Sequence, residues 1–107
     1  MKRFDFTRAA KRWGGLVILP NGTQFYAFVH PLRYKSRMYL ELQNNPIGSS
    51  SAAKYLYIGP PEHDITWLLP QDTITVSGEA YSVLVSEPVW FANRIEYYRA
   101  ILSKRRG

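Results

Sequence analysis

Residues 72–102 read DTITVSGEAYSVLVSEPVWFANRIEYYRAIL, and this stretch decides the fold. It predicts three strands joined by two turns, which cover residues 73–76, 80–86 and 95–102. Ser77-Gly78 supplies the first turn, because glycine takes the positive φ that a tight hairpin needs. The second turn falls near Ala92-Asn93-Arg94. Pro88 cannot donate a ladder hydrogen bond, so we expect the middle strand to bend or end there.

This β-meander must bury its apolar face against the rest of the chain. In the middle strand, alternation places Leu84 on the face opposite Tyr81, Val83 and Val85. The side chains expected in the core are Ile74, Val76, Tyr81, Val83, Val85 and Ile101.

The N-terminal segment predicts a short helix over residues 4–13, with Phe4 and Trp13 near its apolar side. Gly14-Gly15 ends it. Ten residues do not hold a helix alone, so Phe4 and Trp13 must dock on another surface. That surface is either the chain's own barrel or a neighbouring subunit.

Upstream of the meander, four further strands are predicted over residues 16–19, 23–30, 38–43 and 55–58. Pro20-Asn21-Gly22 marks a hairpin turn. A short apolar piece, residues 65–69, precedes Pro70. We therefore expect a single domain over residues 1–107 that is all-β. Its fold is a small six- or seven-stranded barrel or sandwich with a short N-terminal helix and a long flexible internal loop.

The internal loop covers residues 44–54 and is small and polar, with Ile47 as its one large apolar residue. Loops near a dozen residues are uncommon in compact domains and are often functional. A tolerated surface insertion is equally compatible with this composition.

The charge of the chain is concentrated at its ends. Residues 1–12 carry a net charge of +4, residues 104–107 carry +3, and residues 13–103 carry −1. Basic ends are typical of solvated tails, and they also suit contact with nucleic acid or an acidic partner. The nearly neutral body argues against a nucleic-acid site on the barrel itself, so we expect any such binding to be weak and lost without both basic ends.

Residues with catalytic chemistry are scarce. Glu62-His63-Asp64 follows two prolines and is interpreted as a solvated loop, and His30 as a strand or core histidine. The chain has no cysteine and shows no phosphate loop, nucleophile motif or zinc-ligand spacing. We expect no enzyme, no cofactor and no metal. No apolar run approaches a membrane span and no signal peptide is visible, so we expect no membrane contact.

The order of several short motifs resembles the small head–tail connector proteins of tailed bacteriophages and prophages, in particular the head-completion or stopper type. The motifs are YAFVHPL at 26–32, YLYIGP at 55–60, LPQDTI at 69–74, GEAYSVL at 78–84, SEP at 86–88 and YRAIL at 98–102. The resemblance covers about residues 14–104, and its motifs are structural rather than catalytic.

The resemblance implies a small β-barrel that forms a ring below the portal and adaptor proteins in the neck of the virion, after assembly in the bacterial cytoplasm. The ring would close the DNA channel and dock the tail, with packaged DNA contacted without sequence preference. In the family, a loop between barrel strands plugs the channel. It maps here onto Gln43, Asn44, Asn45, Pro46, Ile47, Gly48, Ser49, Ser50, Ser51, Ala52, Ala53 and Lys54.

The basic residues at both ends are candidates for contacts with neighbouring subunits or DNA. They are Lys2, Arg3, Arg8, Lys11, Arg12, Lys104, Arg105 and Arg106. The alternative function is a monomeric nucleic-acid-binding barrel, in which aromatic side chains stack on bases and basic residues follow phosphates.

Overall fold

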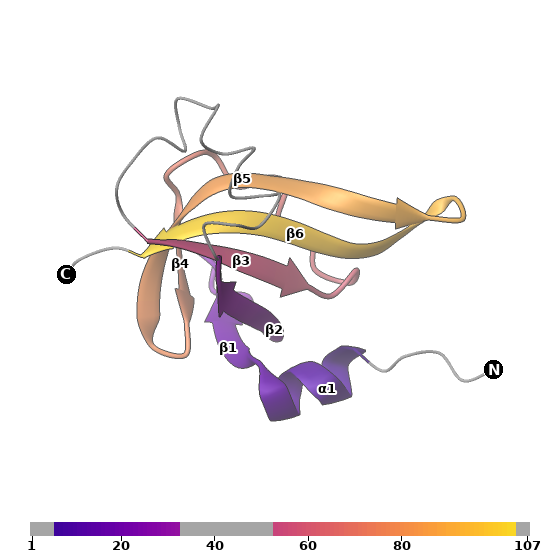
Figure 1. Cartoon of the computed structure of the whole chain (residues 1–107), viewed down its shortest axis with the longest axis horizontal. Helices are drawn as coiled ribbons and strands as arrows, with labels where there is room; N and C mark the ends of the chain where they lie inside the picture. Colours follow the sequence, from indigo (N-terminus) through magenta and orange to yellow (C-terminus); the bar gives the residue numbers. More distant parts are fainter. Residues whose placement is uncertain (1–5, 33–52, 105–107) are drawn as a thin grey trace.

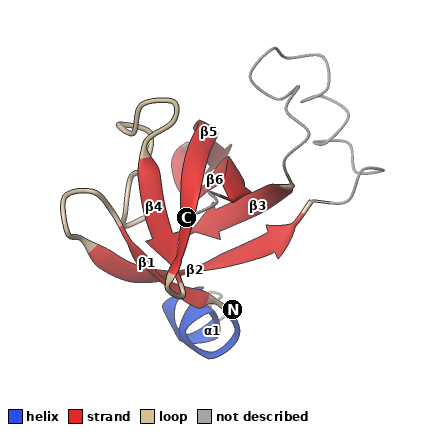
Figure 2. Cartoon of the chain, turned by 90° about the vertical axis from the view of Figure 1, so that its left-hand side faces the viewer, coloured by secondary structure: helices blue, strands red, loops and turns tan. Residues whose placement is uncertain are grey.

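Six strands close into an antiparallel β-barrel with one helix outside it (Figures 1 and 2) in the computed structural model, which describes residues 6–32 and 53–104. The elements are α1 (Phe6–Trp13), β1 (Gly15–Ile18), β2 (Gln24–Pro31), β3 (Lys54–Gly59), β4 (Thr73–Val76), β5 (Glu79–Phe91) and β6 (Arg94–Lys104). The strand order is β1-β2-β3-β6-β5-β4, and β4 pairs with β1 to close the barrel. The predicted all-β barrel with a short N-terminal helix is confirmed.

The predicted meander is present as β4, β5 and β6, joined by two-residue turns. Ser77 and Gly78 have φ of 51° and 82°, and Ala92 and Asn93 have φ of 50° and 68°. Positive φ at both central positions gives a backbone twist that matches the twist of the flanking strands. Both turns therefore lie where the sequence placed them.

The β1–β2 hairpin is closed by the predicted Pro20-Asn21-Gly22 turn. The Leu19 N–H donates to the Thr23 carbonyl at 2.9 Å, and the Gly22 N–H donates to the Leu19 carbonyl at 2.9 Å. Of the three turn residues, only Gly22 takes a positive φ, at 89°. This is the three-residue hairpin loop in which glycine occupies the left-handed position.

Pro88 was expected to bend or end the middle strand. The strand does not end there, since β5 continues to Phe91 and Pro88 pairs with Tyr98 on β6. β4 pairs with β5 only as far as Ser82, so the later part of β5 has β6 as its one neighbour among the described strands. Proline is tolerated on such an edge strand, because the side away from β6 has no ladder to interrupt. β5 and β6 consequently form a long hairpin that projects beyond the barrel (Figure 1).

The prediction that Val85 belongs to the core is also wrong, because its side chain is 46% exposed. Val83 pairs with Leu102 and Val85 pairs with Ile101, so Leu84 is an extra residue in β5. Such a bulge turns every later side chain to the other face. Val85 therefore shares the outer face with Ile101, which is buried there in a small separate cluster with Leu84.

The main core fills the barrel interior. Its buried members are Val17, Leu19, Phe25, Ala27, Tyr57, Ile65, Leu68, Ile74, Val76, Tyr81, Val83, Tyr98, Ala100 and Leu102. Ile65 and Leu68 come from the connection between β3 and β4, which turns rather than forming a strand. The apolar piece at 65–69 thus contributes side chains to the core without adding a strand.

Helix α1 packs across β1 and β2 on the outside of the barrel (Figure 2). Ala10 is fully buried, and the Phe6 ring meets the Phe28 ring edge-on at 5.3 Å. A Cβ on Gly14 would lie 2.2 Å from the Ala27 carbonyl oxygen, so the close approach at the end of the helix requires glycine there. Trp13 is 72% exposed, so its side chain does not dock on the chain's own barrel, and docking on a neighbouring subunit stays a prediction.

Several sequence predictions lie wholly or partly outside the described residues. These are the strand at 38–43, the start of the helix and the docking of Phe4, most of the internal loop, and the outermost basic residues at both ends.

Candidate functional site

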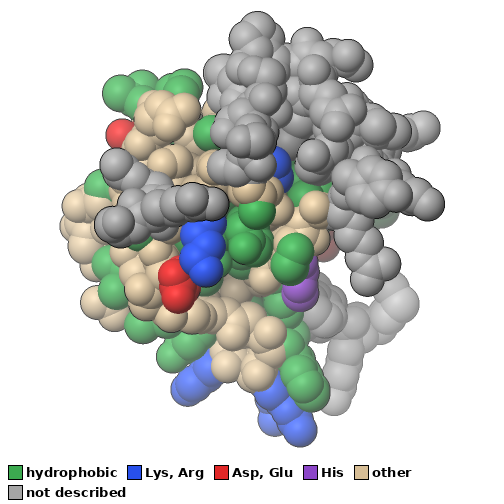
Figure 3. Space-filling view, turned by 60° about the vertical axis from the view of Figure 1, so that its left-hand side comes forward, with side chains coloured by type: hydrophobic (Ala, Val, Ile, Leu, Met, Phe, Trp, Pro, Cys, Tyr) green, Lys and Arg blue, Asp and Glu red, His purple; other side chains and the backbone are tan. Residues whose placement is uncertain are grey.

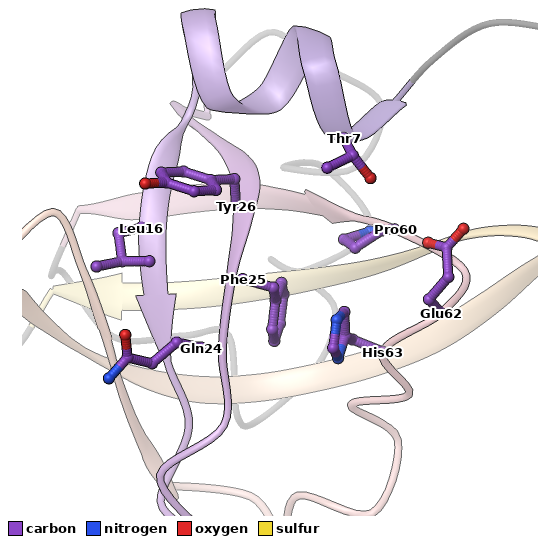
Figure 4. Close-up of a pocket in the computed structure, with 8 residues that line it drawn as sticks. All are labelled: Thr7, Leu16, Gln24, Phe25, Tyr26, Pro60, Glu62 and His63. Carbon is purple, nitrogen blue, oxygen red and sulfur yellow. The ribbon is translucent and has the colours of Figure 1, made fainter.

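A pocket of about 570 Å³ opens between α1, the β1–β2 hairpin and the connection that follows β3 (Figure 4). Its lining residues are Thr7, Leu16, Gln24, Phe25, Tyr26, Pro60, Glu62 and His63. Phe25 and His63 stand face to face in the pocket, with ring centroids 4.3 Å apart and an angle of 6° between their planes. Three of the eight lining residues carry aromatic rings, and Glu62 is the single carboxylate in the lining.

The Glu62-His63-Asp64 segment forms an ordered loop, and its side chains do not converge. The Asp64 carboxylate accepts from the Thr66 backbone N–H at 2.7 Å, and the Trp67 indole N–H donates to the Asp64 carbonyl at 2.7 Å. His63 is half-buried on Phe25, whereas Glu62 and Asp64 are exposed. Across residues 6–32 and 53–104, no group of three His, Asp or Glu side chains is placed to hold a metal.

His30 is an exposed strand residue on the outer face of β2. Its ring lies 6.3 Å from the Phe28 ring in a nearly parallel arrangement. The interpretation of His30 as a strand residue is confirmed.

A second functional candidate is the tip of the β5–β6 hairpin, where two large aromatic side chains meet the solvent. Trp90 is 62% exposed and Phe91 is 68% exposed, next to the Ala92-Asn93 turn. Phe91 is paired with Arg94, which is also exposed. Exposed aromatic side chains next to one another are typical of protein interaction sites.

The basic candidates lie in two separate regions. Arg8, Lys11 and Arg12 are exposed on α1, and Figure 3 shows Lys and Arg side chains gathered over the helix at the lower edge of the molecule. The Arg12 guanidinium lies 5.2 Å from the centre of the Trp13 ring. Lys104 ends β6 and is paired with Glu79 at 3.6 Å. The remaining basic candidates Lys2, Arg3, Arg105 and Arg106 fall outside the described residues.

The candidate plug residues, 43–54, run into the first residue of β3. Residues 43–52 fall outside the described residues, and Ala53 is exposed immediately before the strand. Lys54 is 4% exposed and pairs with Ser103 on β6, so its assignment to the loop is wrong. Its backbone carbonyl accepts from the Leu32 N–H at 2.9 Å, which explains why the ladder already includes this residue.

Burial sets the ionisation of the few titratable groups in the barrel. It raises the pKa of Tyr57 far above the ordinary range, and it raises the pKa of Tyr81 and Tyr98 as well. It lowers the pKa of Lys54. The Tyr57 hydroxyl is buried, and no described residue offers it a hydrogen-bond partner.

Comparison of the chain with protein-family models, with curated proteins and with solved structures gave no match. Among the described residues, no helix combines the length and apolar character that crossing a membrane requires.

Sequence reasoning missed both the pocket and the hairpin tip. The pocket joins residues from three distant parts of the chain, so no local pattern announces it. The tip had a signal in the apolar run Val89-Trp90-Phe91 beside the predicted turn. Because the middle strand was expected to bend or end at Pro88, this run was not assigned to a strand.

Proposed function

We propose that this chain is a structural protein of the neck of tailed phage particles. It forms a ring below the portal that closes the DNA channel and docks the tail. Its partners are further copies of itself, portal or adaptor proteins, and tail proteins, with packaged DNA contacted without sequence preference. The order of motifs along the barrel supports this proposal.

The observation that carries the proposal is the projecting β5–β6 hairpin with its exposed Trp90 and Phe91. Aromatic residues are enriched in protein interfaces, and Trp is frequent among the few residues that carry most of the binding energy. They stand on a body with a net charge of −1 over residues 13–103. Such a surface suits protein contacts better than it suits the phosphate backbone of nucleic acid.

The test is the composition of purified particles from the phage or prophage that carries the gene. The chain should be present in several copies per particle and should cross-link to the portal or adaptor protein. Its absence from mature particles, with cross-links confined to non-structural proteins, contradicts the proposal.

The alternative is a nucleic-acid-binding barrel, which one observation favours. Arg8, Lys11 and Arg12 are exposed on α1, the helix whose Thr7 lines the pocket that also contains the stacked Phe25–His63 pair. Sites that bind single-stranded nucleic acid usually combine basic side chains with aromatic rings on which the bases stack.

The nucleic-acid alternative is tested by neutralising the basic ends. Because Ala10 is buried, substitution is cleaner than deletion of the helix. The variant therefore lacks residues 105–107 and carries Lys2→Gln, Arg3→Gln, Arg8→Gln, Lys11→Gln, Arg12→Gln and Lys104→Gln. We expect weak binding of labelled DNA by the unmodified chain, falling steeply between 50 and 200 mM salt and lost in the variant. Fluorescence anisotropy measures this.

Arg94→Gln is the matched control, because it removes an exposed arginine outside both ends. It should leave the weak binding nearly unchanged. Tight binding by the unmodified chain that persists at about 200 mM salt supports the nucleic-acid alternative, because it requires contacts beyond the phosphate charges.

A further inference from the structure

The hairpin tip exposes aromatic side chains on both of its faces. Trp90 and Phe91 are successive strand residues, so their side chains leave opposite faces of the hairpin. A flat partner surface covers one such face and leaves the other in water. Removing both rings from water requires a recess that takes in the end of the hairpin.

The pocket between α1 and the β1–β2 hairpin is a recess of suitable size and lining. Its volume of about 570 Å³ falls among those of pockets that enclose large apolar groups. Tyr26 and His63 are half-buried, so their rings offer aromatic surface to an incoming side chain, while Phe25 is buried beneath His63 and supports it (Figure 4). Offset and edge-on ring contacts stabilise such an arrangement beyond the area they bury.

The charges of tip and pocket are complementary. Arg94 is the one charged residue among residues 89–95 of the hairpin end, and it is exposed. Glu62 is exposed in the pocket lining, which contains no Lys or Arg. Opposite charges at the edge of a contact fix its register and suppress the wrong partner.

We propose that the hairpin tip of one copy, with Trp90, Phe91 and Arg94, inserts into the pocket of the next copy and pairs with its Glu62. The tip is exposed within its own chain, so its own pocket does not hold it. Tip and pocket are different surfaces, so the contact is head-to-tail and repeats from copy to copy, which closes a ring when the rotation permits. This inference rests on the proposed ring function and names the contact that builds the ring.

The test exchanges the charges of Arg94 and Glu62 and measures how strongly the full chain associates with itself. Sedimentation equilibrium up to about 1 mM protein, a range that captures weak contacts, gives the association constant. Arg94→Glu and Glu62→Arg should each weaken association by about tenfold or more, because each places like charges together. The double variant should recover most of the loss. Trp90→Ala with Phe91→Ala should abolish association, since these rings fill the pocket.

Leu69→Ala is the control, because Leu69 is 67% exposed and lies in neither surface. It should associate as the unmodified chain does. A chain that stays monomeric up to about 1 mM overturns this inference. So does association that the tip variants leave unchanged, or charge reversals that do not rescue one another. None of these results removes the chain from the particle, so particle composition tests the neck function separately.

Discussion

The Leu102→Ala variant is expected to lose about 2–5 kcal/mol of unfolding free energy. Leu102 is fully buried in β6, opposite Val83 on β5 and Tyr55 on β3. Its side chain therefore meets both neighbouring strands of the barrel. Truncation leaves a cavity that the closed ladder cannot collapse to fill, which adds to the lost burial. Urea denaturation followed by circular dichroism measures the loss.

Leu69→Ala is the matched control, since it deletes the same atoms from a side chain that is 67% exposed. It should change the unfolding free energy by no more than about 0.5 kcal/mol. Equal losses in the two variants would show that the barrel interior is wrongly placed.

Deletion of Pro46 to Ala53, replaced by a short glycine bridge, is expected to give particles that package DNA and then leak it. The proposed plug contributes these residues from every copy to the channel, so the deletion opens all positions at once. The deletion stops before Lys54, whose backbone is part of β3, and it removes no member of the described core. The isolated variant should therefore fold.

The measurement is the fraction of DNA-filled heads after purification, compared between the deletion and a particle with the unmodified chain. A length-matched replacement of the same segment by glycine and serine separates loss of the side chains from loss of the chain itself. Normal retention in the deletion variant refutes the plug and leaves the segment a tolerated insertion. Failure of the isolated variant to fold assigns the segment to the core instead.

Local turn chemistry was predicted well from the sequence. In the Ser77-Gly78 and Ala92-Asn93 turns, Gly78 and Asn93 are residues that tolerate positive φ, and such preferences act over two or three positions. Alternation then assigned Ile74, Val76, Tyr81 and Val83 to the interior, where they are buried.

The errors arise where pairing with a distant strand overrides the local pattern. The bulge at Leu84 depends on register against β6, so alternation alone carried Val85 to the wrong face. Pro88 ends a central strand but is tolerated on an edge, and which of these applies depends on where β4 stops. The local sequence predicts that Lys54 ends a polar loop, whereas in the structure it pairs with Ser103 and is the first residue of β3.

The candidate interaction surfaces were the least predictable part. The pocket exists only because α1, β2 and the connection after β3 converge in space. The exposure of Trp90 depends on how far the β5–β6 hairpin extends past the barrel, and that length follows from the edge position of Pro88. No local pattern marks the convergence at the pocket, and the apolar run Val89-Trp90-Phe91 is the local signal of the tip.

Disruption of the gene, with the full-length chain supplied in trans as the control, tests the neck function most directly. Particles are counted by electron microscopy as filled or empty heads, with or without tails. We expect heads that have packaged and lost their DNA, together with unattached tails, and restoration of filled tailed particles by the supplied chain. Filled, tailed particles in normal yield from the disrupted gene would contradict the account.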